Sequence, residues 1–161
     1  MNIRPAEPRD RARIHEILVA CTLFTEEEVR CAIELVDIYN DPNDPERNDY
    51  RTCVVEEPGG RVQGYVTFGL TPLTDGVYDL YWIAVDPKQQ GQGFGQVLLR
   101  FVENEVKRQR GRMLLIETSS KTSYASTLRF YERAGYIEIS RIKDFYRVED
   151  DKIVFCKRLT Q

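Results

Sequence analysis

Residues 79–95 read DLYWIAVDPKQQGQGFG and comprise an apolar strand, a proline turn, a glycine loop and the start of a helix. Residues 79–85 are almost entirely apolar, which is typical of a central strand buried on both faces. Strict alternation predicts that Asp79 shares a face with Tyr81, Ile83 and Val85. The strand ends at Asp86-Pro87 because proline has no N–H to donate to a ladder.

Three glycines, Gly91, Gly93 and Gly95, follow the turn and lead into an amphipathic helical pattern. A helix N-terminus presents free N–H groups and a partial positive charge, and glycines let an anion approach the backbone closely. The stretch therefore predicts a phosphate cradle. The simpler alternative is a glycine-rich loop before an ordinary helix.

Two common phosphate motifs do not fit this loop. A dinucleotide fingerprint would need a glycine at Gln96, and a P-loop would need Gly-Lys-Ser/Thr. The loop QGQGFG instead resembles the acyl-coenzyme A loop of the GNAT superfamily of N-acetyltransferases, with Gln90, Gly93 and Gly95 at its fixed positions. A second block, FYERAGY at 130–136, resembles a later signature of the same superfamily. Two blocks in the right order are far more specific than either alone.

Composition narrows the class of protein. A length of 161 residues predicts a single domain over 1–161. A net charge of −3 predicts no nucleic-acid partner, and no apolar run reaches the roughly 18 residues of a membrane-spanning helix. The four cysteines lack C-x-x-C spacing, which is typical of reduced thiols in a cytoplasmic protein. With His15 as the only histidine, we expect no metal site. The sequence leaves monomer or homodimer open.

The order of predicted elements is β-α-α-β-β-β-α-β-α-β-β. The expected strands are 3–6, 51–57, 61–70, 77–85, 112–118, 136–142 and 152–159, and the helices begin near residues 11, 25, 94 and 124. The helix between the fourth and fifth strands makes these two strands parallel. This order resembles the GNAT fold: an α/β domain whose mixed, mostly antiparallel sheet of six or seven strands has one splayed parallel pair and about four flanking helices.

The resemblance implies an enzyme that moves an acetyl group from acetyl-CoA to a primary amine by direct attack. It places the cofactor on backbone groups of the strand end and the loop, namely Ile83, Ala84, Val85, Gln90, Gly91, Gln92, Gly93, Phe94, Gly95 and Gln96. The acceptor is a small amine or a protein amine. Two other classes stay open: a non-catalytic acyl-CoA sensor on the same fold, and a nucleotide-binding protein.

Three residues are candidates for proton transfer. The resemblance implies that Tyr131, in the second block, protonates the sulfur of coenzyme A as it leaves. The alternative is that the Tyr131 ring has only a packing role in the core. Asp79 is the candidate base, because a carboxylate among apolar neighbours has a raised pKa. Glu117, at the end of the other parallel strand, is the second candidate for the base. For each of the two carboxylates, the simpler alternative is a structural ion pair with a nearby basic side chain.

The acceptor pocket is the part of the predicted site for which the sequence gives the fewest indications. The family often has asparagine seven residues before the signature tyrosine, where it contacts the cofactor, whereas this chain has Tyr124 there and departs from that pattern. We expect Tyr124 to line the acceptor pocket instead. The acidic residues 149–151 are a second candidate lining, although a solvated turn is the simpler interpretation. At the start of the second helix, Thr25 and Glu28 have the spacing of a capping box.

Overall fold

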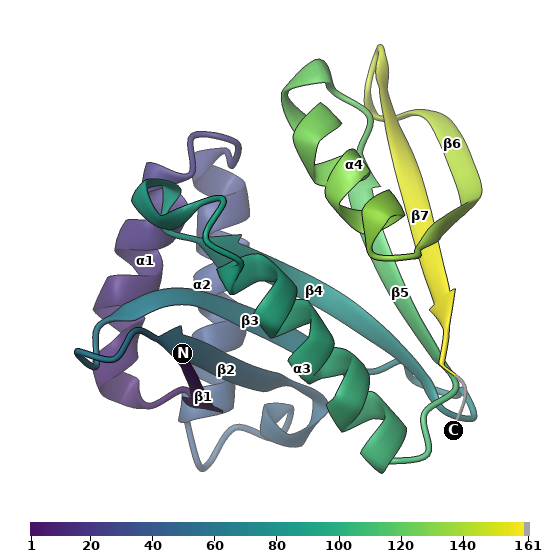
Figure 1. Ribbon diagram of the computed structural model, residues 1–161. Coiled ribbons are helices and arrows are strands. Elements are labelled where there is room, and N and C mark those ends of the chain that lie inside the picture. Colours follow the sequence, from purple (N-terminus) through teal and green to yellow (C-terminus); the bar gives the residue numbers. More distant parts are fainter. Residues whose placement is uncertain (160–161) are drawn as a thin grey trace.

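The computed structural model describes residues 1–159, and its central element is one seven-stranded sheet in the order β1-β2-β3-β4-β5-β7-β6 (Figure 1). The strands are β1 Asn2–Pro5, β2 Arg51–Glu56, β3 Val62–Leu70, β4 Val77–Val85, β5 Met113–Ser119, β6 Ile137–Arg147 and β7 Asp150–Arg158. Only β4 and β5 pair in parallel; every other neighbouring pair among the described residues is antiparallel. The predicted fold class is confirmed.

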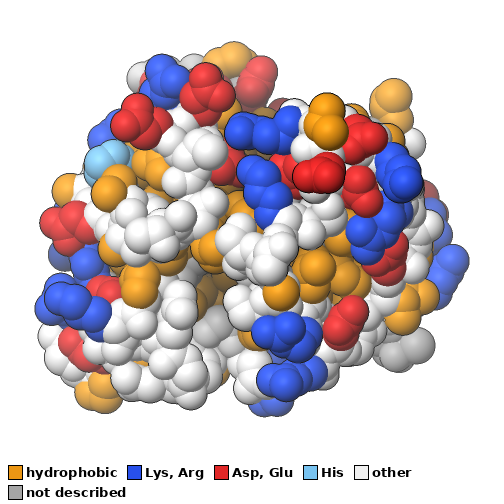
Figure 2. Space-filling model, turned by 90° about the horizontal axis from the view of Figure 1, so that it is seen from above, with side chains coloured by type: hydrophobic (Ala, Val, Ile, Leu, Met, Phe, Trp, Pro, Cys, Tyr) orange, Lys and Arg blue, Asp and Glu red, His pale blue; other side chains and the backbone are white. Residues whose placement is uncertain are grey.

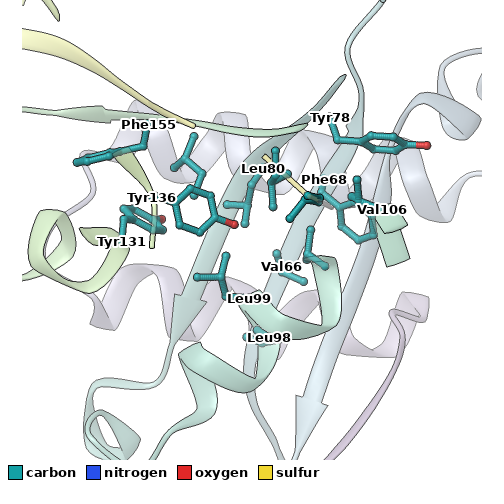
Figure 3. Close-up of a cluster of buried hydrophobic side chains, with 14 of the residues drawn as sticks. Val66, Phe68, Tyr78, Leu80, Leu98, Leu99, Val106, Tyr131, Tyr136 and Phe155 are labelled. Atoms are coloured by element: carbon teal, nitrogen blue, oxygen red, sulfur yellow. The ribbon is translucent and has the colours of Figure 1, made fainter. Parts of the chain in front are cut away.

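Helices cover both faces of the sheet. The helices are α1 Arg11–Ala20, α2 Glu26–Asn40, α3 Phe94–Arg108 and α4 Ala125–Arg133. One hydrophobic core joins α1 and α2 to the sheet and contains Ile14, Val36 and Tyr65. The other core joins α3 and α4 to the opposite face, and Figure 3 shows Leu98 and Phe155 within it. None of the helices within residues 1–159 is long and apolar enough to cross a membrane.

The sheet divides between β4 and β5. These strands pair only from Val77↔Met113 to Leu80↔Ile116. Beyond that point β4 stays paired with β3 as far as Val85, and β5 stays paired with β7 as far as Ser119. Each strand therefore follows its own antiparallel partner, and Figure 1 shows the two parts of the sheet diverging upward as a V.

A β-bulge in β4 corrects the predicted alternation. Thr67 of β3 pairs with Trp82, whereas the next residue, Phe68, pairs with Leu80, so Tyr81 is an extra residue in β4. The bulge reverses the faces that follow: Leu80 and Ile83 both pack on the α3 side. Asp79, next to Leu80, therefore faces the α1–α2 side, and the prediction that it shares a face with Ile83 and Val85 is wrong.

The carboxyl-terminal hairpin is longer than predicted. β6 and β7 leave only residues 148–149 between them, so residues 144–147 and 150–151 belong to strands. Asp150 is only 2% exposed; it accepts a hydrogen bond from the Ser119 hydroxyl and lies 3.2 Å from the Lys121 ammonium. The interpretation of this segment as a solvated turn is therefore wrong for Asp150. Its partners, Ser119 and Lys121, lie at the end of β5 and just after it, far from Asp150 in the sequence.

Candidate active site

A cavity of about 1300 Å³ occupies the divergence between β4 and β5. Its walls come from β4 beyond Leu80, β5 beyond Ile116, the loop before α3, one face of α4, the segment between α1 and α2, and the β6–β7 hairpin. Figure 2 looks down on this hollow, which has hydrophobic side chains in its depth and charged side chains of both signs on its rim.

The glycine loop that was predicted to bind phosphate lines one part of the cavity. Gly91 and Gly93 have φ values of 80° and 88°, a left-handed conformation that favours glycine, and Gly93 is the N-cap of α3. A Cβ at either position would meet no other atom within 4 Å. The N–H groups of the first turn, Phe94 to Gln96, have no intrahelical acceptor, so they are available to an anion in the cavity.

Nine of the ten predicted cofactor residues line the cavity. They are Ile83, Ala84, Val85, Gln90, Gly91, Gly93, Phe94, Gly95 and Gln96. The exception is Gln92, whose N–H donates to the Gln89 carbonyl at 3.4 Å. A Cβ at Gly95 would lie 3.6 Å from the Phe130 ring of α4, which is an ordinary van der Waals distance.

An ion pair fixes the base of the cradle. Asp86 lies between β4 and the 3₁₀ turn Pro87–Gln89; it accepts a hydrogen bond from the Lys88 N–H at 2.9 Å and is paired with Arg13 of α1. Burial raises the pKa of Asp86, but the hydrogen bonds and charges of Arg13 and Lys88 together outweigh burial and lower the pKa of this carboxyl. The loop is thus held to α1 by a charge-assisted contact.

Tyr131 is a buried residue whose side chain lines the cavity. The residue is 4% exposed, and its ring centroid lies 5.3 Å from that of Phe130 and 5.9 Å from that of Phe155. Figure 3 shows the ring beside Tyr136 and Phe155. Among residues 1–159 its hydroxyl has no hydrogen-bond partner in the protein. Burial raises the pKa of Tyr131, so the hydroxyl keeps its proton at neutral pH.

Tyr124 closes the opposite part of the cavity. It is 9% exposed, and its hydroxyl donates to the Leu23 carbonyl at 3.3 Å, which links the segment before α4 to the segment between α1 and α2. Burial raises the pKa of Tyr124 to about 12, with further contributions from the charges of Glu28 and Asp150. Tyr124 is among the residues that line the cavity, and its role toward the acceptor stays a prediction.

The two candidate bases differ in position. Glu117 lines the cavity, and its carboxylate lies 2.7 Å from the Lys152 ammonium. Asp79 is not among the lining residues; its carboxylate accepts a hydrogen bond from the Thr71 hydroxyl at 2.6 Å. Burial raises the pKa of Asp79, and the charge of Glu117 raises it further, while the Thr71 hydrogen bond opposes both.

Sequence reasoning missed several lining residues. Glu28 was predicted only as the second residue of the capping box with Thr25. The capping box is present, since the Glu28 carboxylate accepts a hydrogen bond from the Thr25 N–H at 2.7 Å, but Glu28 also lines the cavity. Arg129 and Arg133 of α4 and Tyr146 of β6 also line the cavity. Their helical or strand positions alone do not indicate which face meets the cavity. No group of three or more His, Cys, Asp or Glu side chains within residues 1–159 is placed to hold a metal ion.

Comparisons with known proteins agree with this fold and site. The family model of the acetyltransferase (GNAT) domain matches residues 48–138, more than half of the chain. A solved protein assigned to the GNAT family from Desulfovibrio desulfuricans is 38% identical, with a TM-score of 0.90 over 99% of both chains. The chain therefore belongs to the GNAT acetyltransferase family, and the predicted family is confirmed.

Two more distant relatives bear on chemistry. S-(2-succino)cysteine N-acetyltransferase from Bacillus subtilis is 29% identical over 89 residues, which are 53% of this chain and 54% of that protein. The chain thus spans about half the length of the curated relatives it matches. The yncA protein of Salmonella typhimurium, solved with its cofactor acetyl-CoA, has the same fold at 22% identity, with a TM-score of 0.75 over 100% of this chain and 95% of that one.

Proposed function

We propose that this chain is an N-acetyltransferase that moves an acetyl group from acetyl-CoA to a primary amine by direct attack in a ternary complex. The observation that carries the proposal is the parting of β4 and β5 beyond Leu80 and Ile116, which opens a cavity with an anion cradle at one end. Family membership and relatives named as N-acetyltransferases support it. We also propose a single domain over 1–161 and a cytoplasmic location.

The residues present fit acetyl-CoA. Glycine at 91 and 93 leaves open space above the backbone, and the free N–H groups of the first turn of α3 suit a pyrophosphate. Arg129 and Arg133 add positive charge to the same part of the cavity. Beyond Leu80 the side of β4 that faces β5 has no strand partner in the described chain, so its backbone groups suit the amides of pantetheine.

The chemistry needs one proton removed and one supplied. When bound, acetyl-CoA supplies a thioester whose carbonyl carbon the amine attacks, so that a C–N bond forms and the C–S bond breaks. Tyr131 would give its proton to the departing sulfur, since its side chain lines the cavity, its hydroxyl is protonated and this hydroxyl has no hydrogen-bond partner within residues 1–159. The amine proton would go to Glu117, which lines the cavity, or to Asp79 through water.

The acceptor is an amine of a small molecule or of a protein. Relatives are named for S-(2-succino)cysteine, for L-2,4-diaminobutyric acid and for an alanine of ribosomal protein bS18. These names share only the acetylated amine, so the family does not fix the acceptor.

Turnover tests the proposal directly. The chain is incubated with acetyl-CoA and a panel of primary amines, and both the released thiol and the N-acetyl product are measured. We expect equimolar thiol and acetylated amine with at least one acceptor. If acetyl-CoA binds but no amine is acetylated, the chain is an acyl-CoA-binding protein and the proposed transferase function is wrong.

A further inference from the structure

The acidic side chains that line the cavity come from α2, β5 and β7, and none of those in the described residues comes from the glycine loop or α4. Four carboxylates contribute to the lining, namely Glu27, Glu28, Glu117 and Asp150. The glycine loop and α4 instead contribute two arginines. The lining is therefore polarised: the elements that suit the cofactor phosphates carry cations, and the acidic elements are left for the acceptor.

Three of the four carboxylates already have a cation of the protein beside them. Asp150 lies 3.2 Å from Lys121, Glu117 lies 2.7 Å from Lys152, and Glu27 lies 4.0 Å from Arg30. Within residues 1–159, Glu28 has no such partner. One of its oxygens accepts the Thr25 N–H at 2.7 Å, and the side chain is half-buried in the cavity wall.

Glu28 lines the cavity close to two tyrosines of the same wall. Its charge helps to raise the pKa of both Tyr124 and Tyr146, which are themselves lining residues, although burial is the larger cause in each case. Phe24 and Trp82 complete this wall, with ring centroids 5.6 Å apart. Aromatic faces next to a carboxylate bind ammonium groups favourably.

The cations that line the cavity near Glu28 do not neutralise its carboxylate. Apart from the arginines of α4, Lys121 and Arg147 are the cations among the described residues that line the cavity, and Lys121 is already paired with Asp150. Arg147 is exposed at the rim, and no carboxylate lies within 4 Å of it among the described residues. Tyr131, a buried residue, also lines this cavity.

We propose that Glu28 binds a second positively charged group of the acceptor, so that the preferred substrate is a diamine rather than a monoamine. This inference rests on the proposed N-acetyltransferase function. One amine loses a proton and forms the C–N bond as the C–S bond of the thioester breaks, with the sulfur receiving a proton. The other amine stays protonated beside the Glu28 carboxylate and the aromatic wall.

The test compares kcat/KM for 1,4-diaminobutane and 1-aminobutane, which share a four-carbon chain, at saturating acetyl-CoA. We expect the wild type to favour the diamine and Glu28→Gln to lower the diamine-to-monoamine ratio about tenfold, the effect of one charge-assisted hydrogen bond. Glutamine can still accept the Thr25 N–H, so the capping box and the melting temperature should be retained.

The control is Glu26→Gln, which removes a carboxylate from the same turn of α2 outside the cavity lining and should leave the ratio unchanged. Equal kcat/KM for both amines in the wild type, or a ratio that Glu28→Gln does not change, would overturn the role of Glu28 while leaving the transferase function intact. Failure to acetylate any amine of a wider panel would overturn the transferase function and this inference with it.

Discussion

Leu80 of β4 pairs with Ile116 of β5, and this is the last pair that joins the two parallel strands. Beyond it, one edge of β4 loses its partner although the strand continues to Val85. Backbone N–H and C=O groups at such an edge need a hydrogen-bonding partner, and in the proposed function that partner is the cofactor. Cofactor binding should therefore stabilise the fold.

Acetyl-CoA at one hundred times its Kd should raise the free energy of unfolding by about 2.7 kcal/mol. The cradle, the arginines of α4 and the open edge of β4 together match a ligand that has both phosphates and amides. Thermal unfolding with and without ligand measures this. ATP and NAD at equal concentration serve as controls and should do much less. No shift with acetyl-CoA at millimolar concentration would contradict the proposed cofactor site.

Gly93→Val should abolish the acetyl-CoA shift, because the side chain would enter the open space of the cradle. Its φ of 88° also disfavours valine, so the variant itself should lose about 1–3 kcal/mol of stability. Gly60→Val is a matched control: Gly60 has a φ of 78°, equally open surroundings, and lies outside the cavity lining. If both variants keep the shift, the cradle lies elsewhere.

Tyr131→Phe should lower kcat about tenfold to a hundredfold, toward the loss typical of a general acid, with little change in acetyl-CoA affinity. Phenylalanine retains the ring contacts with Phe130 and Phe155. Tyr136→Phe is the control, because its hydroxyl donates to Glu103 at 3.1 Å and it does not line the cavity. Equal kcat in Tyr131→Phe and wild type, with chemistry shown to be rate-limiting, would leave Tyr131 a packing role only.

The sequence predicted those parts of the site that depend on local backbone chemistry. Gly91 and Gly93 indicate a loop whose backbone an anion can approach because glycine has no Cβ, and the strand–helix–strand order indicates the parallel pair; the left-handed conformation of both glycines was not predicted. The bulge at Tyr81 was not predicted, because it arises from cross-strand register and involves no glycine or proline. The burial of Asp150 depends on Ser119 and Lys121, about 30 residues earlier in the chain, and leaves no local pattern.

Arg13→Gln should destabilise the fold by about 1–3 kcal/mol at pH 7, because Asp86 would lose a hydrogen bond to a charged partner. The pKa of Asp86 is lowered in the folded state, so this stability is present above about pH 4 and is lost as pH falls through the folded pKa. Urea unfolding at several pH values should therefore show the variant and wild type converging in acid. Arg9→Gln, in an exposed pair with Glu7, should change little. A difference that does not shrink in acid would contradict the ion-pair origin.

The last prediction assigns the base. Burial raises the pKa of Asp79, so its ionised form costs stability as pH rises through that pKa, and Asp79→Asn should be at least as stable as wild type at pH 7. Glu117 lines the cavity beside Lys152, whereas Asp79 bonds to Thr71 outside the lining. If Asp79 acts through water, activity should rise with pH along a limb that Asp79→Asn shifts or erases, while Glu117→Gln mainly raises KM for the acceptor. The measurement is the pH profile of kcat/KM for both variants with one amine of known pKa. If Glu117→Gln erases the limb and Asp79→Asn leaves it intact, Glu117 is the base; if neither moves it, ionisation of the amine itself sets the limb and neither carboxylate is required as the base.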